Sequence, residues 1–364
     1  MQPTAVTNAA REAPEDSGRY RLARLRDHWY VAVRSSKLGK RPVATTIFDL
    51  PLVLFRNASG TAAALLDRCA HRNVPLSMGR VNGERLACRY HGWEYDAEGV
   101  CRFIPALCGP QEARSRRVTA FPVVEQQGFV WVWMNPESEP SCRPHHFEHV
   151  DDTSYRSFVV DYRVNATLHA TFENMLDVPH TAFLHRGLFR GGERNRITAV
   201  VRRSAGGVEA QYVGEPRPTG LAARILGLGE GADDELVHFD RFLLPSISQV
   251  EYRLGNSHFV ATSALTPESD FVTRFSALLT YRLPLPGFLL RALFEPVARR
   301  ILGQDAHVLA RQTDTVRRFG GERYASTSVD VLGPEIWRLL KRAADGEPPD
   351  ASVGASEHRV DLLV

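Results

Sequence analysis

The sequence predicts an α+β protein of two domains, a small all-β domain followed by an antiparallel sheet that packs against a long C-terminal helix. Length is the first observation, because 364 residues at about 150 residues per domain suggest two domains. The second is a series of short β-branched and aromatic runs, separated by Gly, Pro and Asn, over residues 27–136. The third is a mixture of strand patterns and one long helical pattern after residue 150.

The N-terminal domain is expected over residues 20–136. Residues 1–19 are polar, mix both charges and lack periodicity, so we expect a mobile tail there. From residue 27 onward, apolar runs such as HWYVAV and FVWVW alternate with turn residues, which is typical of short strands. A segment rich in Pro, His and Ser follows at residues 137–149, and we expect the domain boundary in it.

The C-terminal domain is expected over residues 150–345. Two helical patterns are present, one over residues 171–185 that Pro179 interrupts and a longer one from Pro286 to Arg318. The remaining patterned segments favour strands; they are residues 155–167, 197–204, 207–214, 238–254, 258–267 and 271–283. We therefore expect one antiparallel sheet against a long C-terminal helix, and a C-terminal tail at residues 346–364.

Composition and charge exclude several classes of protein. Lys and Arg total 45 and Asp and Glu total 42, so a net charge of +3 gives no electrostatic signature of nucleic-acid binding. Five Cys at irregular spacing do not form a disulfide framework, which favours a reducing compartment and a cytoplasmic location. No run of 18 apolar residues predicts a transmembrane helix, and the N-terminus lacks the apolar core of a signal peptide.

Two short clusters of cysteine and histidine lie in the expected β domain. Cys69 and His71 are followed, after sixteen residues, by Cys88 and His91. Thiolates and imidazoles are ligands for zinc and for iron–sulfur clusters. In a Rieske [2Fe–2S] cluster, two Cys bind one iron and two His bind the other, so each mixed pair would serve both irons. A Cys2His2 zinc site is the alternative, although zinc modules usually pair Cys with Cys and His with His.

A second cluster of candidate ligands lies in the interrupted helical segment. Non-haem Fe(II) oxygenases bind iron through two His and one carboxylate. His180 and His185 are the candidate pair, but residues five apart lie about 140° apart on an ideal helix. A distortion is therefore required, and Pro179 can cause one. Asp177 precedes His180 by three residues, so these two side chains can meet.

The third ligand is expected on the long C-terminal helix. An apolar stripe through Val297 and Ile301 continues, four residues later, at Asp305. A carboxylate in line with an apolar stripe points inward, where it needs a partner or a metal. The alternative is a buried ion pair with Arg299 or Arg300. His307 is a competing ligand, but the helical period turns it away from this face.

These motifs resemble those of Rieske non-haem iron oxygenases. The first pair reads CAHRNVPLSMGRV and the second reads CRYHGWEYDAEGVCRFIP. They are most similar to terminal oxygenase (alpha) subunits of the vanillate O-demethylase and dicamba monooxygenase type, strongly over about residues 25–135 and then through the His motif. The resemblance implies a Rieske [2Fe–2S] cluster, a mononuclear Fe(II), and a catalytic domain with the helix-grip fold of START and Bet v1 proteins.

The resemblance also implies roles for individual residues. It makes Asp305 the carboxylate ligand of the iron, beside His180 and His185. It makes Asp177 the residue that links a Rieske histidine of one subunit to an iron-binding histidine of the next, in a head-to-tail homotrimer. Asn174 occupies a position close to the iron in such enzymes. Asp177 and Asn174 are thus the candidate catalytic residues.

The function implied is that of a terminal oxygenase that hydroxylates or O-/N-demethylates a hydrophobic or aromatic small molecule with O2. The chain has neither G-x-G-x-x-G after a strand nor the Cys spacing of a plant-type ferredoxin, so electrons must come from a separate ferredoxin or NAD(P)H-dependent reductase. Desaturation or oxidative cyclisation on the same scaffold is one alternative, and an electron carrier that uses only the cluster is another. We expect the substrate pocket to include the loops at residues 187–196 and 214–235.

Overall fold

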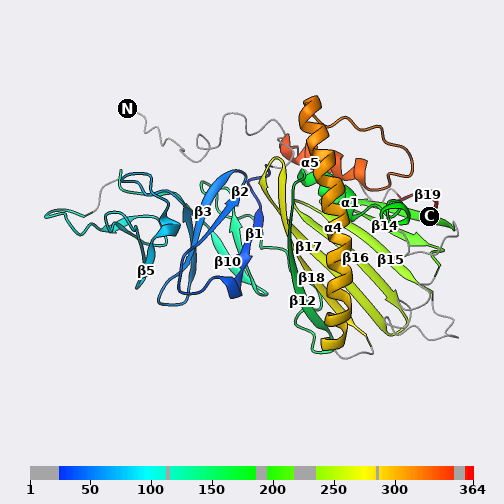
Figure 1. The fold of residues 1–364 in the computed structure, drawn as a ribbon, viewed down its shortest axis with the longest axis horizontal. Helices are drawn as coiled ribbons and strands as arrows, with labels where there is room; N and C mark the ends of the chain where they lie inside the picture. Colours follow the sequence, from blue (N-terminus) through cyan, green and yellow to red (C-terminus); the bar gives the residue numbers. More distant parts are fainter. Residues whose placement is uncertain (1–23, 112–114, 186–194, 217–234, 284–286, 348–356) are drawn as a thin grey trace. The chain divides into compact units, whose positions relative to one another are not determined.

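The computed structural model describes residues 24–111, 115–185, 195–216, 235–283, 287–347 and 357–364. It divides into two compact units at residues 146 and 147, within the segment rich in Pro and His. The expected tail at residues 1–19 lies outside the described residues. The expected α+β class is confirmed, because an all-β unit precedes a unit with one large sheet and helices (Figure 1).

The first unit contains three small antiparallel sheets. Their strand orders are β1-β11-β10, β2-β3-β4-β9 and β5-β6-β7-β8. The strands are β1 (Trp29–Arg34), β2 (Val43–Ile47), β3 (Leu50–Arg56), β4 (Ala62–Leu66), β5 (Arg80–Asn82), β6 (Arg85–Ala87), β7 (Glu94–Tyr95), β8 (Cys101–Phe103), β9 (Ala120–Phe121), β10 (Val123–Gln126) and β11 (Phe129–Trp133). Two short 3-10 helices, Ser35–Lys37 and Leu76–Met78, also lie within the described part of this unit.

Two separate apolar cores stabilise this unit. One core is formed around Tyr30, Leu52 and Val130 from the first two sheets. The other contains Cys69, Cys88, Tyr95 and Cys101, together with aliphatic side chains of neighbouring strands. The two candidate cysteine ligands are therefore part of a packed core, which fixes the loops that carry them.

The second unit is built on one eight-stranded antiparallel sheet of order β12-β18-β17-β16-β15-β14-β13-β19. Its strands are β12 (Arg156–Val164), β13 (Arg196–Ser204), β14 (Gly207–Val213), β15 (Val237–Leu243), β16 (Ile247–Leu254), β17 (Ser257–Ser269), β18 (Val272–Arg282) and β19 (Glu357–Leu363). Sequential hairpins join β14 through β18 except where residues outside the described ranges intervene. The antiparallel sheet expected from the strand patterns is thereby confirmed.

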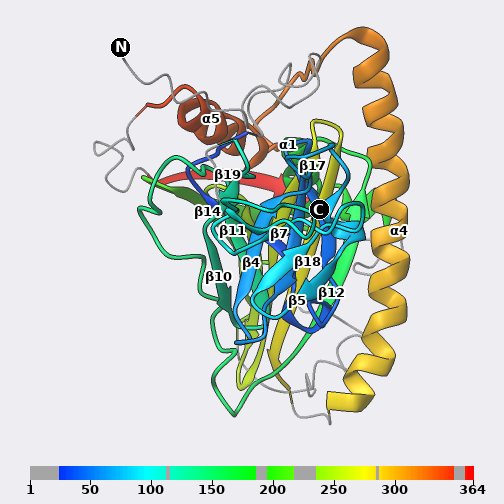
Figure 2. The same ribbon diagram turned by 90° about the vertical axis from the view of Figure 1, so that its left-hand side faces the viewer.

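The helices among the described residues of this unit are α1 (Leu168–Met175), α2 (Thr181–Leu184), α4 (Gly287–Phe319) and α5 (Gly333–Ala344). The long α4 runs beside the sheet in both views (Figures 1 and 2). Its buried residues Asp305, Leu309, Thr313 and Val316 follow the helical period, so one stripe of α4 faces inward. No described helix is long and apolar enough to cross a membrane.

Two sequence expectations about strands are wrong. The segment at residues 238–254 is not one strand but two, β15 and β16, which turn at Pro245 because proline cannot donate to a strand ladder. The expected tail at residues 346–364 contains β19, which pairs with β13 at the edge of the sheet. Leu362 and Val364 are buried there, which stabilises the last strand.

Candidate metal centres

Two tight loops of the first unit carry the Cys and His pairs. In the first loop the Cys69 amide donates to Val74, and the Asn73 amide donates back to Cys69. In the second loop the Cys88 amide donates to Trp93, and the Gly92 amide donates back to Cys88. Gly92 has a φ of +71° in the left-handed region, which glycine adopts without strain. The two loops thus share one pattern of hydrogen bonds around their cysteines.

The loops separate the thiols from the imidazoles. Cys69 and Cys88 are 2% and 4% exposed, whereas His91 lies at the surface. The His71 and His91 rings are 4.5 Å apart, and Trp93 stacks on His71 at 4.7 Å. Burial raises the pKa of the Cys88 thiol, and the nearby Cys69 raises it further. Two buried thiols and two adjacent, more exposed imidazoles fit a cluster whose two irons have different ligands.

A buried nitrogen supports this fit. His71 Nδ1 is buried and has no hydrogen-bond partner in the part of the chain that the structure describes. Such a nitrogen is costly unless something binds it, and a metal ion would do so. The donor set of this site, two thiols and two imidazoles, therefore suits a Rieske [2Fe–2S] cluster.

Sequence reasoning missed one neighbour of the cluster site. The Tyr95 hydroxyl lies 3.2 Å from Cys69 Sγ and accepts the Ala70 amide proton at 3.2 Å. Because the Tyr95 hydroxyl oxygen accepts the Ala70 amide proton, its own hydroxyl proton can point at Cys69 Sγ. Tyr95 is fully buried. Its position two residues after Trp93 was the feature of the sequence that could have identified it.

The second site forms where the helical pattern breaks. Helix α1 ends at Met175, the chain passes Pro179 without helical structure, and the single turn α2 follows. His180 precedes α2 and His185 follows it, so the two residues flank one helical turn. This break in the helix is the distortion that His180 and His185 need in order to face the same point. The sequence expectation of an interruption at Pro179 is confirmed.

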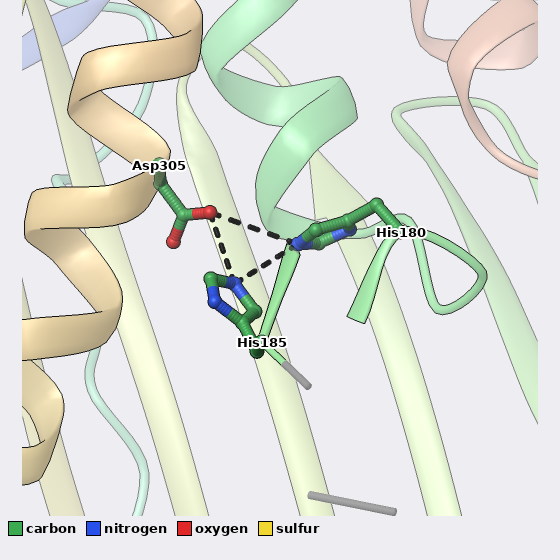
Figure 3. A group of neighbouring side chains, drawn as sticks. All are labelled: His180, His185 and Asp305. Atoms are coloured by element: carbon green, nitrogen blue, oxygen red, sulfur yellow. Dashed lines mark hydrogen bonds and ion pairs between the residues drawn. The ribbon is translucent and has the colours of Figure 1, made fainter. Parts of the chain in front are cut away.

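Three ligand atoms converge at this point (Figure 3). His180 Nε2 and His185 Nε2 lie 3.3 Å apart. Asp305 Oδ1, from α4, lies 3.0 Å from His185 Nε2 and 3.7 Å from His180 Nε2. All three ligand atoms lie within 4.8 Å of one another, as a metal ion would require. Two imidazoles and one carboxylate are the ligand set of non-haem Fe(II) enzymes.

Neighbouring acceptors fix the two imidazole rings. His180 Nδ1 donates to the Asp177 carbonyl at 2.5 Å, and the His180 amide donates to Asp177 Oδ2 at 3.1 Å. His185 Nδ1 donates to Gln304 Oε1 at 2.9 Å. Because both Nδ1 atoms carry the ring protons, both Nε2 atoms keep the lone pair that can bind a metal. Gln304 is a second residue that sequence reasoning did not single out.

A neighbouring hydrogen-bond donor also fixes the Asp305 carboxylate. Asn174 Nδ2 donates to Asp305 Oδ1 at 3.3 Å, so Asn174 contacts the site from the last turn of α1. Burial raises the pKa of Asp305, although His185 and Asn174 oppose that shift. Burial also disfavours the charged form of His180, but Asp177 and Asp305 outweigh it and raise its pKa.

The alternatives for Asp305 do not match the structure. Arg299 pairs instead with Glu295 on its own helix, at 2.6 Å, and Arg300 is exposed. His307 is exposed on the outer side of α4. The stripe faces the two histidines from Asp305 onward, whereas Val297, which was expected to face inward two turns earlier, is 43% exposed.

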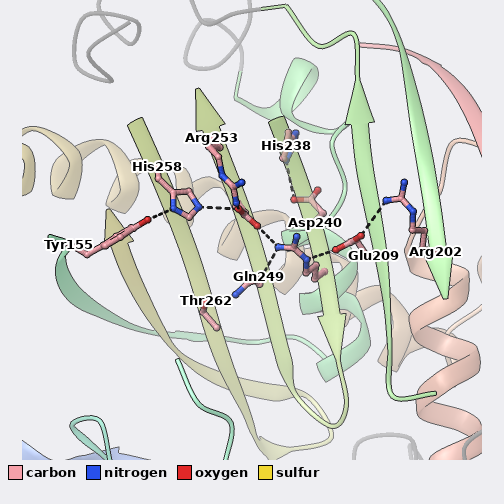
Figure 4. A network of polar contacts seen from close by, with 11 residues as sticks. Tyr155, Arg202, Glu209, His238, Asp240, Gln249, Arg253, His258 and Thr262 are labelled. Carbon is pink, nitrogen blue, oxygen red and sulfur yellow. Dashed lines mark hydrogen bonds and ion pairs between the residues drawn. The ribbon is translucent and has the colours of Figure 1, made fainter. Parts of the chain in front are cut away.

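Polar clusters also occupy the sheet of this unit. On one face, His258, Glu251 and Arg241 belong to a chain of contacts across several strands (Figure 4). On the other face, His238 lies between Glu215 at 2.6 Å and Asp240 at 3.1 Å. Burial lowers the pKa of His238, but the two carboxylates dominate and raise it to about 9.

The cluster of His238 lies on the face of the sheet that carries the metal-site helix. Phe242, two residues after Asp240, contacts Phe172 of α1 at 4.8 Å between ring centroids. Of the loops expected to line the pocket, residues 187–194 and 217–234 lie outside the described residues.

Comparison with known proteins identifies two domains in the chain. Residues 28–122 match the model of the Rieske [2Fe-2S] domain, and residues 164–346 match that of the vanillate O-demethylase oxygenase C-terminal domain. The oxygenase component of dicamba O-demethylase from Stenotrophomonas maltophilia is 34% identical over 188 residues, which are 51% of this chain and 55% of that protein. The vanillate O-demethylase oxygenase subunit of Pseudomonas sp. (strain HR199 / DSM 7063) is 24% identical over 358 residues, 89% of this chain and 97% of that protein.

Solved structures extend the similarity to the fold. Dicamba monooxygenase bound to 3,6 dichlorosalicylic acid matches with a TM-score of 0.77 and 26% identity, over 89% of this chain and 98% of that chain. Dicamba monooxygenase with non-heme iron and dicamba matches over the same shares, with a TM-score of 0.74 and 26% identity. The chain spans about half the length of the first curated relatives it matches.

The match to the Rieske domain model supports a [2Fe–2S] cluster, and the similarity to an iron-containing structure supports a mononuclear iron. The side chains of this chain fit both cofactors. The catalytic-domain model alone covers residues 164–346, which is half of the sequence. The chain therefore belongs to the Rieske non-haem iron oxygenases, in the group whose C-terminal domain is that of the vanillate O-demethylase oxygenase.

Proposed function

We propose that this protein is the terminal oxygenase of a Rieske system, which uses O2 and electrons from a separate ferredoxin or NAD(P)H-dependent reductase to hydroxylate or O-/N-demethylate an aromatic or hydrophobic small molecule. One observation carries the proposal: two imidazole nitrogens and a carboxylate oxygen converge within 4.8 Å in a chain that also has a Rieske domain. An electron carrier would need the Rieske domain alone. We also infer a cytoplasmic location, because five Cys at irregular spacing do not form a disulfide framework.

In this proposal each cofactor has its own ligands. Cys69 and Cys88 hold one iron of the cluster, and His71 and His91 hold the other. His180, His185 and Asp305 hold the mononuclear iron. When bound, the cluster transfers single electrons and the mononuclear iron activates O2. The chain itself orients the ligands, through Asn174 at Asp305, Gln304 at His185 and Asp177 at His180.

The names of the relatives suggest the class of substrate. They include a dicamba O-demethylase, a methylxanthine N1-demethylase and a vanillate O-demethylase oxygenase subunit. Each of these named compounds is a ring that carries a methyl group on oxygen or nitrogen. We therefore favour demethylation of a compact aromatic substrate here, with hydroxylation next and desaturation or cyclisation as the alternative on the same scaffold.

We further propose a head-to-tail homotrimer in which Asp177 links two subunits. Asp177 is positioned for this, because its carboxylate contacts His180 and its side chain remains 30% exposed. A partly exposed acceptor beside a metal ligand can receive a hydrogen bond from a neighbouring subunit. The molar mass in solution tests the trimer, and a monomer at working concentration would contradict it.

Metal analysis tests the proposed function. We expect about three irons and two acid-labile sulfides per chain, and a Rieske EPR signal after reduction with dithionite. Product mass in a screen of methoxy- and N-methyl-substituted aromatics then separates demethylation from desaturation. About two irons that stay at two after Fe(II) reconstitution would favour an electron carrier, and zinc without sulfide would overturn the whole assignment.

Removing the hydroxyl of Tyr95 is expected to lower the reduction potential of the cluster. A hydrogen bond to a cluster sulfur stabilises the more negative, reduced form. Loss of about 1 kcal/mol corresponds to a fall of roughly 40–60 mV for a one-electron couple. A redox titration followed by EPR measures it in Tyr95→Phe. The control is Tyr30→Phe, whose buried hydroxyl donates to Leu25 in the other core. An unchanged potential in Tyr95→Phe would refute the role of this bond.

Replacing Gln304 by leucine is expected to weaken Fe(II) binding. Gln304 is the acceptor for His185 Nδ1, and such partners of metal-bound histidines are typically worth 10–100-fold in affinity. Competition with an Fe(II) chelator gives the dissociation constant. Gln304→Glu keeps an acceptor at this place and should retain tight binding. Equal affinities for the leucine variant and the wild type would contradict the prediction.

A further inference from the structure

A line of titratable side chains leads along α1 to the metal site. His169, Glu173 and Asp177 follow one another at intervals of four residues, with Asp177 just past the end of the helix. Residues at this interval lie on one side of a helix. Asp177 contacts the ligand His180. Neither His169 nor Glu173 has a part in binding iron, so their place on this line needs another explanation.

Both residues are packed against the first residue of α5. His169 Nε2 donates to the Gly333 carbonyl at 3.1 Å. A Cβ on Gly333 would lie 2.5 Å from Glu173 Oε1, so the Glu173 carboxyl lies directly against that α-carbon. Gly333 leaves just enough room for the carboxyl. The position of Glu173 is therefore fixed by tertiary packing and not only by the helix.

Three acidic groups act electrostatically on Glu173. Asp177 follows it on the chain, and Glu322 and Asp330 approach from the segment that joins α4 to α5. His169 lies one helical turn before it on the same helix. Burial raises the pKa of Glu173, Asp330, Asp177 and Glu322 add to that shift, and His169 opposes it. A carboxyl in these surroundings holds a proton more readily than an exposed glutamate does.

One further acidic group near this place is paired elsewhere. Glu335, in the first turn of α5, binds Arg203 and Arg338. His169 is 5% exposed, and its Nδ1 has no hydrogen-bond partner in the described part of the chain. A buried imidazole nitrogen without a partner can accept a proton or a water molecule.

The residues on the Glu322 side of Glu173 reach the solvent. Glu322 accepts a hydrogen bond from the Thr167 hydroxyl at 2.5 Å, at the start of α1. Tyr324, which interacts with Glu322, is 40% exposed. Carboxylates thus lie on both sides of Glu173, from the surface segment to the end of α1 that adjoins the metal site.

The proposed reaction consumes protons: RH + O2 + 2 e− + 2 H+ → ROH + H2O. Electrons alone do not complete this reaction, and the side chains of the ligands His185 and Asp305 are only 2% and 13% exposed, so we expect the protein to help deliver the protons. We propose that Glu173 is the residue that takes up protons from the Glu322 and Asp330 side of the molecule and passes them towards the metal site. The inference rests on the proposed function and deepens it, since Glu173 acts through its neighbours and does not touch the iron.

The test compares Glu173→Gln, which keeps the shape but cannot carry the proton, with Glu173→Asp, which keeps the acid. Holoenzyme reduced with dithionite is mixed with O2, and reoxidation of the cluster is followed in H2O and D2O. We expect Glu173→Gln to slow reoxidation by roughly 10- to 100-fold, with iron and sulfide contents unchanged. Glu173→Asp should recover most of the rate. The control is Glu347→Gln, an exposed partner of Arg342 at the end of α5.

The pH profile gives a second signature. In the wild type the rate should fall as pH rises through the raised pKa of Glu173, because the proton is then lost, and this step should be absent in Glu173→Gln. Infrared difference spectra of the iron-free protein should show the carbonyl band of a protonated carboxyl that Glu173→Gln removes. A Gln variant with the wild-type rate and profile overturns the inference, as does an Asp variant as slow as Gln. If instead wild-type reoxidation is independent of the mononuclear iron, the proposed function fails, while the infrared band still decides whether Glu173 holds a proton.

Discussion

Replacing Asp305 by alanine is expected to abolish binding of the mononuclear iron and leave the Rieske cluster in place. The side chain supplies the only carboxylate oxygen among the three atoms that converge at the site. Its loss leaves two imidazoles, and we expect Fe(II) affinity and turnover to fall by more than about 100-fold, beyond the range typical of a residue that only supports a ligand. Iron and sulfide per chain, with the EPR spectrum of the reduced protein, measure both centres in one sample.

Stability separates loss of a ligand from loss of the fold. Burial raises the pKa of Asp305, so above that pKa its charge destabilises the iron-free protein. The alanine variant should therefore unfold at a temperature no lower than that of the iron-free wild type. Asp314→Ala, on the same helix but exposed beside Arg311, is the matched control and should keep its iron. An Asp305→Ala protein with about three irons per chain would refute the assignment.

Local patterns in the sequence were sufficient for most of the candidate ligands. The Cys69–His71 and Cys88–His91 pairs each lie within a few residues, so their spacing already limits them to one loop each. Asp305 was found by a different route, since the helical period of α4 places it on the buried stripe that continues to Leu309. In both cases short-range geometry carried the information.

Contacts between residues distant in sequence could not be found in this way. Strand β19 pairs with β13 across some 160 residues, and its seven residues alone look like a polar tail. Gln304 supports His185 from a helix 119 residues later, and Glu173 meets Gly333 only because α5 packs on α1. Tyr95 is nearer in sequence to Cys69, but its hydroxyl reaches the sulfur only through the packing of two loops. Tertiary packing decides these neighbours, and no periodic pattern encodes it.

Exchanging Asp177 for asparagine should keep both metal sites and remove most of the turnover. Asparagine has nearly the same shape and can still accept the His180 amide proton, so we expect iron and sulfide contents to be unchanged. It lacks the charge that helps to hold His180 and that would accept a hydrogen bond from a neighbouring subunit. A fall in steady-state O2 consumption of roughly 10- to 100-fold is expected. A variant that turns over normally would rule out the bridge.

Mixed assemblies test whether electrons cross between subunits at this place. Cys88→Ala chains should lack the cluster, and Asp305→Ala chains should lack the mononuclear iron, so each assembly alone should be inactive. If the cluster of one subunit serves the iron of the next, co-expressed and co-purified mixed trimers contain working pairs, and O2 consumption returns to a fraction of the wild-type value. Adding Asp177→Asn to the Cys88→Ala chain should then remove that activity. In each working pair, the Cys88→Ala chain is the one that holds the mononuclear iron. Mixed trimers that stay inactive with both metals present in the expected amounts would mean that electrons pass within one chain, and Asp177 would then have no role between subunits.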